Sequence, residues 1–385
     1  MPDGREVTTI KVLSSLKDVP AEQWDACAGA DNPFVCHGFL SALEDSGSAS
    51  ADSGWLAQHL TALDENGTVI GAAPLYVKSH SYGEYVFDWG WADAYERAGG
   101  QYYPKLLCAV PFTPASGRRL LVHPNAPADM TDVLIAGIAQ SAEKTRVSSA
   151  HITFLTKSEF DRCSENGLLQ RVGRQFHWEN RGYDSFDDFL ATLMSRKRKT
   201  IRKERAAIEE QNIEMIRLTG SDITESHWDA FYAFYRDTTD RKWGHRYLTR
   251  SFFSLLHERL PDRVVLVLAK HDGRYVGGAI NLKGHDTLYG RYWGCIEDFK
   301  FLHFETCYYQ AIDYAIAHKL AWVEAGAQGP HKIQRGYLPR STYSAHWIAD
   351  PRFRDAVQQF VDAEQREIER EIELLSQESP YRRES

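Results

Sequence analysis

Two stretches of the sequence share one pattern, and this pattern decides the fold class. Residues 60–78 read LTALDENGTVIGAAPLYVK, and residues 267–284 read VLAKHDGRYVGGAINLKG. In each stretch two apolar strands flank a turn, at 64–67 in the first and at 271–273 in the second. Asn-Gly and Asp-Gly between apolar runs predict a β-hairpin. Because both second strands also carry a similar run of small residues, the two hairpins indicate one structural unit that occurs twice.

The segments around both hairpins follow the same order. Two helical stretches precede each hairpin, a third strand follows it, and a helix that leads into a short strand comes last. In the first half these are helices 21–28, 37–46 and 129–145, a strand that ends at 88–90, and strand 151–155. In the second half they are helices 224–239, 251–259 and 305–318, a strand that ends at 292–294, and strand 322–325. The repetition predicts an α/β (α+β) chain of two tandem domains from an internal duplication, although unrelated glycine hairpins also look alike.

The expected domains are residues 1–175 and 176–350, followed by a long C-terminal helix and tail over 351–385. The boundary falls near 171–183, before a helix start with capping-box spacing at Ser185 and Asp188. Opposite charges at i,i+4 spacing over 351–377 are typical of a long solvated helix. Residues 379–385 are expected to be a frayed tail.

Composition excludes several classes of protein. The chain has 385 residues, 43% of them hydrophobic, and 45 basic against 53 acidic residues give a net charge of −8. A disordered chain and a generally basic, DNA-binding protein are therefore not expected. The longest aliphatic run is Val264–Ala269 and no apolar signal core follows the N-terminus, so we expect a cytoplasmic protein without stable membrane insertion. The six cysteines form no CxxC pair and are expected to be reduced, mostly buried thiols; no histidines have paired metal-ligand spacing, so no metal is expected.

A strongly basic segment opens the second predicted domain. Residues 195–205 read SRKRKTIRKER, and a helical wheel over 186–208 collects apolar residues on one face. The opposite face is cationic, with Lys197 as the misfit. Like charges at i,i+4 spacing destabilise a helix, so a phosphate-bearing ligand is a simple compensation, although a solvated polar face is the alternative. The candidate phosphate-binding residues are Arg196, Arg198, Lys199, Arg202 and Lys203, and the wheel also places Arg205 on this face.

The stretch from 288 to 343 has the densest set of chemically useful residues. A Gly-rich polar loop follows the strand at 322–325, where α/β proteins usually place ligands. The candidate catalytic residues are Glu324 or His331 as a base, with Lys332 and Arg335 as charge stabilisers. Ordinary structural roles, such as an ion pair of Glu324 with a neighbouring cation, remain open for each. The candidate substrate-binding residues are Arg291, Tyr292, Trp293, Gln328, Gly329 and Tyr337.

Three segments carry a family resemblance. The segment HFETCYYQAIDYAIAHKLAWVEAGAQGPHKIQRGYLP (303–339), with RYWGCIEDF before it, resembles the C-terminal signature of the FemAB-like proteins. The basic segment and NPFVCHGFLSALEDSGS (32–48) are similar to further parts of that family. The resemblance covers about 30–375 and implies two tandem domains of the GCN5-related acetyltransferase (GNAT) superfamily. Two departures matter: there is no insertion like the coiled-coil arm of some Fem enzymes, and no Q/R-x-x-G-x-G/A pyrophosphate loop of ordinary acetyl-CoA enzymes.

The resemblance also implies a function. Fem transferases move an amino acid from aminoacyl-tRNA to an amine of a cell-wall peptide precursor. We therefore expect an acyl- or aminoacyltransferase that acts on a small-molecule or peptide amine, with aminoacyl-tRNA or acyl-CoA as donor. Two alternatives remain: an acetyl-CoA-dependent N-acetyltransferase, and a non-catalytic protein that binds tRNA or a cell-wall precursor. Neither the acyl group nor the oligomeric state follows from the residues.

Overall fold

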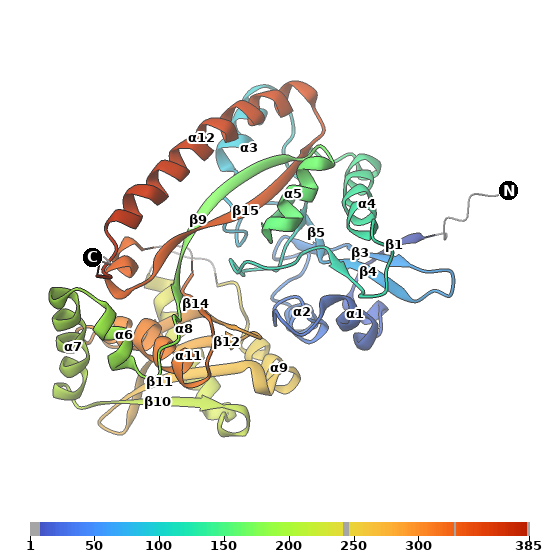
Figure 1. The fold of residues 1–385 in the computed structure, drawn as a ribbon. Helices are drawn as coiled ribbons and strands as arrows, with labels where there is room; N and C mark the ends of the chain where they lie inside the picture. Colours follow the sequence, from blue (N-terminus) through green and yellow to red (C-terminus); the bar gives the residue numbers. More distant parts are fainter. Residues whose placement is uncertain (1–7, 242–245, 327–328, 383–385) are drawn as a thin grey trace. The chain divides into compact units, whose positions relative to one another are not determined.

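The computed structural model describes residues 8–241, 246–326 and 329–382 (Figure 1). The chain divides into two compact units, which we call the first unit (Met1–Gly173 with Ser341–Glu369) and the second unit (Arg174–Arg340 with Arg370–Ser385). The chain passes between the units within β9 (Leu169–Glu179), β15 (Leu338–Ile348) and α12 (Pro351–Gln377). The division differs from the expected one after residue 340, because Tyr343–Ile348 pair with β8 and so return to the first unit. The predicted domain limits themselves stay a prediction, since compact units need not coincide with repeated ones.

The first unit holds two sheets. One has the order β15-β8-β6-β5-β2, in which β6 and β8 are parallel and the other neighbours are antiparallel. Its strands other than β15 are β2 (Trp55–Ala57), β5 (Leu75–Lys78), β6 (Lys105–Cys108) and β8 (Ser149–Leu155). The other sheet has the order β1-β3-β4-β7, formed by β1 (Thr9–Leu13), β3 (His59–Leu63), β4 (Val69–Ala73) and β7 (Leu121–Val122). The predicted hairpin at 60–78 is confirmed as β3 and β4, with Gly67 at a φ of 79° in the turn.

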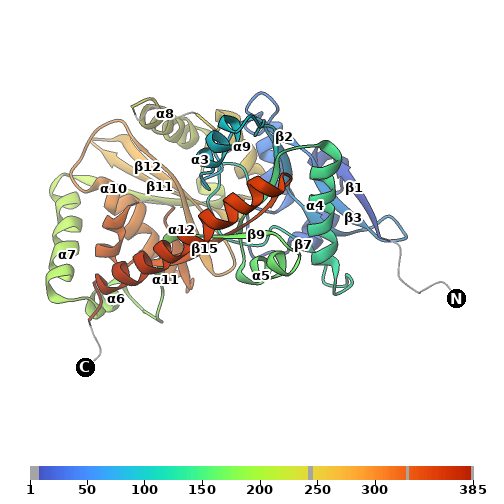
Figure 2. The ribbon, with the colours of Figure 1, turned by 90° about the horizontal axis from the view of Figure 1, so that it is seen from above.

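The helices of the first unit cover its sheets. They are η1 (Leu16–Asp18), α1 (Ala21–Ala28), α2 (His37–Asp45), α3 (Trp89–Arg97), α4 (Met130–Thr145) and α5 (Lys157–Glu165). α4 packs on β3, β4 and β8, and Figure 2 shows it beside β3. Its apolar residues belong to one buried core with those strands. The expected strand end at 88–90 is wrong, because these residues begin α3 and the next strand is β6.

The second unit contains one run of strands in the order β10-β11-β12-β13-β14-β9. The strands are β10 (Ile213–Thr219), β11 (Val264–His271), β12 (Arg274–Lys283), β13 (Thr287–Cys295), β14 (Trp322–Glu324) and the C-terminal part of β9. The predicted hairpin at 267–284 is confirmed as β11 and β12, with Asp272 and Gly273 at positive φ. β13 and β14 are parallel, while the other neighbours are antiparallel.

The helices of the second unit include one irregular segment. They are α6 (Phe186–Thr192), α7 (Ser195–Glu210), η2 (Gly220–Asp222), α8 (Glu225–Arg241), α9 (Arg250–Arg259), η3 (Pro261–Arg263), α10 (Leu302–Phe304), α11 (Gln310–Ala317) and η5 (Pro330–Arg335). A π-helical turn, η4 (Glu305–Tyr309), connects α10 to α11. α8 packs on β12 and β13, and α11 packs on β13 and β14. Single π-turns inside helices frequently lie at functional sites.

The helix expected over 186–208 is divided in two. Leu193 adopts an extended conformation between α6 and α7, where its side chain is fully buried, and Met194 is exposed instead of packed. The C-terminal tail pairs with the chain at this break: the Met194 N–H donates to the Pro380 carbonyl oxygen at 2.9 Å, and Leu193 bridges to Tyr381. Tyr381 is buried, so the expected frayed tail is ordered at least as far as this residue.

The same order of elements occurs in both units. Each has a parallel pair of strands joined through a helix, β6–α4–β8 in the first and β13–α11–β14 in the second. The predicted α/β tandem architecture with a long C-terminal helix is therefore confirmed. Four of the six cysteines are buried and all six are free thiols. Among the described residues, none of the helices combines the length and the apolar character that crossing a membrane requires.

Candidate active site between β13 and β14

A cavity opens where the parallel pair of the second unit separates. The ladder between β13 and β14 ends at Tyr289 and Glu324, whereas β13 continues to Cys295. Beyond this point lies a cavity of about 710 Å³. Its wall is formed by Ala279, Asn281, Gly290, Arg291, Tyr292, Trp293, His303, Cys307, Tyr308, Ala325, Gly329, His331 and Lys332. The end of a parallel pair is therefore the place where the chain gathers polar groups, as in other α/β proteins.

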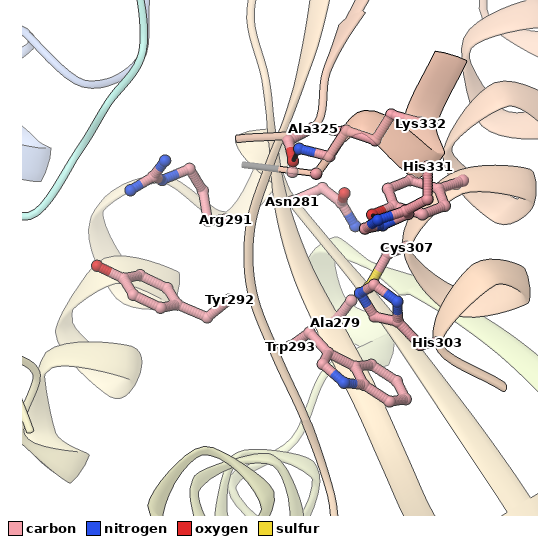
Figure 3. A pocket seen from close by; sticks show the side chains of 13 residues that line it. Ala279, Asn281, Arg291, Tyr292, Trp293, His303, Cys307, Ala325, His331 and Lys332 are labelled. Atoms are coloured by element: carbon pink, nitrogen blue, oxygen red, sulfur yellow. Dashed lines mark hydrogen bonds between the residues drawn. The ribbon is translucent and has the colours of Figure 1, made fainter. Parts of the chain in front are cut away.

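A β-bulge in β13 directs the side chains of this wall. Asn281 of β12 pairs with Gly290 and Ile280 pairs with Tyr292, so Arg291 is the extra residue. In a regular strand successive side chains alternate between the two faces, but a bulge changes this alternation. The Arg291 and Tyr292 side chains accordingly point to one side, whereas Trp293 points to the other, toward His303 (Figure 3).

Lys332 places a buried ammonium group at the end of β14. Its side chain is almost completely buried, and Nζ donates to the carbonyl oxygens of Ala325 at 2.7 Å and Gly326 at 2.8 Å. Burial lowers the pKa of Lys332 to about 8, against a smaller opposing effect of the nearby Cys307. The amine is thus still mostly charged at neutral pH, but it titrates within the range in which enzymes work.

His331 combines a hydrogen-bonded ring with a position on the cavity wall. Its Nε2 lies 2.9 Å from the hydroxyl of Tyr308. Burial lowers the pKa of His331, and the charges of Arg335 and Lys332 lower it further, so the imidazole is neutral at pH 7. Burial also raises the pKa of Tyr308, which keeps its phenol protonated. Gly329 must be glycine here, because its φ is 112° and a Cβ would lie 2.4 Å from the His331 ring.

Arg335 lies behind the wall and holds η5 in place. Its guanidinium stacks over the ring of Phe304 at 3.4 Å, donates to the His331 carbonyl oxygen at 2.9 Å, and donates to Glu204 Oε1 at 2.7 Å. The hydroxyl of Tyr309 donates to the other oxygen of Glu204. Glu204 therefore connects α7 to the two segments that carry His331 and Tyr308, and the structure does not place Arg335 where it was expected to contact a substrate.

Two other predicted residues also lie behind the cavity. Glu324 is buried at the end of β14, with Oε1 3.9 Å from Nε2 of His177. Burial, together with the charges of Arg340 and Lys332, lowers the pKa of His177 to about 3. Because this imidazole is neutral, it forms no ion pair with Glu324. Tyr337 is fully buried and donates its hydroxyl to the Tyr308 carbonyl oxygen at 3.3 Å.

Four of the predicted substrate-binding residues line the cavity, namely Arg291, Tyr292, Trp293 and Gly329. Gln328 lies outside the residues that the structure describes. His331 and Lys332 are the two predicted catalytic residues that the fold brings to the same wall.

α7 presents part of the basic segment to solvent. Arg196, Lys199, Arg202 and Lys203 are exposed, and Arg198 is half-buried. Arg205 does not belong to this face, because its guanidinium binds Glu305 at 3.1 Å and Asp313 at 2.7 Å. Lys197, the misfit of the helical wheel, instead donates to the side chain of Gln334 in η5. α7 thus exposes several cationic side chains to solvent, while Lys197 on the same helix contacts η5, the segment that carries His331.

Sequence reasoning missed Asn281, His303, Cys307 and Tyr308, which line the cavity, and Glu204 behind it. The i,i+4 spacing of His303 and Cys307 was a signal for one shared face. Glu204 is the only carboxylate in the basic run 195–205, which was a signal for a specific role. The π-turn that sets the direction of Tyr308 has no signal of this kind. Among the described residues, no group of three or more His, Cys, Asp or Glu side chains is arranged to hold a metal ion.

Several solved structures share the fold of this chain. The structure of FemX matches with a TM-score of 0.56 at 12% identity, covering 88% of this chain and 98% of that chain. The C-terminal domain of a putative lysylphosphatidylglycerol synthetase from Agrobacterium fabrum matches with a TM-score of 0.56 at 8% identity, covering 89% and 95%. L-PGS from Bacillus licheniformis matches with a TM-score of 0.51 at 8% identity, covering 86% and 98%. At such identities these matches show a shared fold. No curated protein matches the chain.

The chain thus has the same fold as FemX and the lysylphosphatidylglycerol synthetase domain. The family model FemAB-like, described as peptidoglycan biosynthesis/recognition, matches residues 15–383. The chain therefore belongs to the FemAB-like family, and the predicted resemblance is confirmed.

Proposed function

We propose that the protein transfers an acyl group from an activated ester or thioester to an amine, in the cavity between β13 and β14. The observation that carries this proposal is the neutral imidazole of His331, hydrogen-bonded to Tyr308 and beside the buried ammonium of Lys332. A base, a protonated hydroxyl and a cation on one wall are the groups that aminolysis of an ester requires. The fold of FemX and family membership support the same reaction class.

Each group has a defined task in this reaction. The amine nitrogen attacks the carbonyl carbon, and His331 takes the proton that the nitrogen loses. Lys332 stabilises the oxyanion of the tetrahedral intermediate. When the bond to the leaving oxygen or sulfur breaks, the Tyr308 hydroxyl donates a proton to the leaving atom and regains one from His331. The cations of the wall also disfavour an ammonium, so they keep the attacking amine in its neutral, nucleophilic form.

The acceptor is proposed to be an amine of a peptidoglycan peptide precursor, because the family is described by peptidoglycan biosynthesis and recognition. The donor is proposed to be aminoacyl-tRNA or acyl-CoA, both of which carry phosphates. Arg196, Lys199, Arg202 and Lys203 on α7, with the half-buried Arg198, are proposed to bind those phosphates. Glu324, Arg335 and Tyr337 are proposed to position the wall rather than to contact a substrate.

The deciding experiment is a mass-spectrometric transfer assay. Purified protein is incubated with a precursor peptide that carries one free amine, together with aminoacyl-tRNA in one reaction and acyl-CoA in another. The expected result is one acylated amine, lost with His331→Ala. Absence of product with both donors, while the protein binds RNA or precursor, would favour the non-catalytic alternative and reject the transferase reaction.

The phosphate role of α7 has its own test. Binding of a short RNA hairpin is measured against salt concentration for Arg202→Gln/Lys203→Gln. The control is Arg366→Gln/Arg370→Gln, which removes the same charge from exposed positions of α12. We expect the salt slope to fall by about 2 in the first variant alone, since each lost phosphate contact lowers it by about 1. Equal slopes in both variants would show that the basic face of α7 is only a solvated surface.

A further inference from the structure

A segment of the first unit has no counterpart in the second unit. β5 and β6 are antiparallel neighbours, and so are β12 and β13, which hold the same positions in the order of elements. Between β12 and β13 the chain needs only residues 284–286, whereas between β5 and β6 it runs through residues 79–104 and forms α3. We call residues 79–104 the insertion. Because the second unit completes its sheet without such a segment, the fold alone does not require it.

The insertion buries charged side chains and exposes aromatic ones. Glu84 and Asp88 are 4% and 2% exposed, whereas globular proteins usually leave carboxylates in water. The side chains of Tyr82, Phe87 and Trp89 are exposed to 43%, 51% and 47%. The centroid of the Trp89 ring lies 5.3 Å from that of Phe87 and 5.8 Å from that of Tyr82. We call these three contacting rings the aromatic platform.

A buried lysine at the start of β6 holds both carboxylates of the insertion. Lys105 is fully buried, and its Nζ donates to Glu84 Oε2 at 2.7 Å and also to Asp88. The hydroxyl of Tyr102 donates to the same oxygen of Asp88 at 2.6 Å. Separating such a buried ion pair would leave an uncompensated charge, so the turn that carries the two carboxylates is held firmly.

Two further cations hold the backbone beneath the platform. Lys78 Nζ donates to the Tyr82 carbonyl oxygen at 3.3 Å. The Arg171 guanidinium donates to the Phe87 carbonyl oxygen at 2.8 Å. The rings are therefore fixed before any ligand arrives, and a fixed surface loses little conformational entropy on binding.

The size of the platform selects a small ligand. An aromatic side chain has an area of about 150–250 Å², so three rings that are about half exposed offer roughly 300 Å². A stable protein interface covers about 800 Å² on each partner, which is far more than the platform provides. An apolar patch of roughly 300 Å² is nevertheless of the size that is often functional on a monomer.

The exposed side of α3 next to the platform carries charges of both signs. Asp93 and Glu96 are exposed and lie four and seven residues after Trp89, so they share its helix face. Arg97 is also exposed, and its Nε donates to the Asp93 carbonyl oxygen at 3.1 Å. The two carboxylates repel phosphates and disfavour insertion into a membrane, where they would lose their hydration. They accept hydrogen bonds from hydroxyl groups, so an uncharged ligand with an apolar face and hydroxyl groups fits this surface.

We propose that the aromatic platform binds pyranose rings of an uncharged oligosaccharide. The C–H groups on one face of a pyranose ring pack on the negative faces of aromatic rings. Its hydroxyl groups lie at the edge of the ring and donate to the carboxylates of Asp93 and Glu96. This site belongs to the first unit alone and does not depend on the proposed acyl transfer in the second unit.

Three uncharged trisaccharides, chitotriose, cellotriose and maltotriose, test the inference. Their binding to the full chain is measured by titration calorimetry, and saturation-transfer NMR identifies the sugar protons that contact the protein. We expect saturable binding of at least one trisaccharide, with the strongest transfer to the C–H protons of one ring face. Sorbitol has hydroxyl groups but no ring face, and it should show no saturable binding at the same concentrations.

Substitution of the central ring locates the binding site. Trp89→Ala should weaken trisaccharide binding by about tenfold, since it removes one stacking ring. Trp89→Phe keeps a ring and should weaken binding less, whereas Phe87→Ala should act in the same direction as Trp89→Ala. Leu374→Ala removes an apolar side chain that is 56% exposed on α12, and it should bind as the wild type does. Thermal unfolding verifies that each variant is folded, as expected for exposed side chains.

Several results would overturn the inference. Trisaccharide binding that is unchanged in Trp89→Ala would place the sugar elsewhere, and no saturable binding of any of the three trisaccharides would reject an oligosaccharide. Phosphatidylcholine vesicles that sediment the wild type but not Trp89→Ala would assign the platform to a membrane surface instead. Trilysine that binds with the same dependence on Trp89 would assign it to a cationic peptide.

Discussion

The two parallel strand pairs of this chain have the same topology but opposite surroundings. In the first unit, the segment that follows β6 is buried, and Gly117 in it donates its N–H to the Phe154 carbonyl oxygen of β8 at 3.0 Å. Arg119 of the same segment is fully buried on backbone carbonyls. In the second unit, the corresponding end of the pair β13–β14 borders a cavity. The two units thus differ at this strand end, which is buried in the first unit and borders a cavity in the second.

Two buried lysines show the same contrast. Burial alone would lower the pKa of Lys105 in the first unit, but the carboxylates of Glu84 and Asp88 raise it above its ordinary value. Lys332 in the second unit has carbonyl oxygens as partners, and burial lowers its pKa to about 8. A lysine paired with carboxylates is fixed in one charge state, whereas Lys332 can change its charge near neutral pH. This property of Lys332 supports the proposed reaction at the wall of the second unit.

The largest expected effect is on kcat, when the proposed base His331 is removed from the cavity beside β13 and β14. His331→Ala should lower kcat by about 10² to 10⁴, the usual contribution of a general base. Its folding should be nearly unchanged, because the ring borders a cavity. Kinetics and thermal unfolding are measured side by side, with the exposed His285→Ala as control. A variant with full activity would move the reaction to another site.

A smaller effect on kcat is expected from Glu204, which pairs with Arg335 behind the cavity wall. Glu204→Ala leaves the guanidinium of Arg335 buried without its carboxylate, which should lower the free energy of unfolding by about 3 kcal/mol. Because Arg335 also holds the His331 backbone, kcat should fall while KM changes little. Denaturant unfolding and steady-state kinetics measure both. Glu204→Ala/Arg335→Met should recover part of the stability, and no recovery would argue against a coupled pair.

A substitution beside the parallel pair β6–β8 of the first unit should lower stability and leave activity unchanged. Arg119→Met removes the donors to the carbonyl oxygens of Ala115, Gly117 and Arg118, so we expect a loss of about 2 kcal/mol in unfolding free energy. The kcat of the folded protein should be unchanged. The exposed Arg97→Met serves as control. A variant of normal stability but low kcat would mean that the first unit also takes part in the reaction.

The smallest effect concerns pH. The base form of His331 requires a pH above its pKa, which lies below the ordinary 6.5, and charged Lys332 requires a pH below about 8. We expect kcat/KM to rise with pH over a range that lies below pH 6.5 and to fall above about pH 8. In Lys332→Met the alkaline decrease should disappear; its persistence would assign that limb to another group.

Stability should change in the other direction over the alkaline range. The folded-state pKa of Lys332 is lowered, so between about pH 8 and its ordinary value of 10.5 the unfolded chain binds more protons at this residue. The contribution of Lys332 to the free energy of unfolding therefore rises with pH across this window. Denaturant unfolding of the wild type and of Lys332→Met at several pH values measures the difference.

Sequence patterns identified the repeated hairpins, most helices and the segment that carries the site. Turn dipeptides and apolar periodicity are local signals, which is why the hairpins β3–β4 and β11–β12 were predicted correctly. The break at Leu193 was missed; there the chain pairs with Tyr381 from the far end of the sequence, a contact that no local pattern indicates. For the same reason Arg205 was placed on the wrong face: its partners Glu305 and Asp313 are about a hundred residues away in sequence.

Local sequence patterns predicted the candidate site only in part as well. His331 and Lys332 were predicted from their density in a Gly-rich loop, and the fold brings both to one cavity wall. Glu324 and Arg335 belong to the same loop, yet their side chains turn away from the cavity toward His177 and Glu204. Density in sequence therefore indicated the region but not the direction of each side chain.

The sequence by itself determined the tandem α/β architecture, the family and the two adjacent residues His331 and Lys332, because these depend on short-range patterns. Only the tertiary structure decided that the strand end is buried in the first unit and borders a cavity in the second, and which charged side chains pair with each other. Those outcomes depend on pairing between residues far apart in the chain, such as Glu204 with Arg335. They also depend on burial, which sets the pKa of Lys332 and has no counterpart in a local pattern.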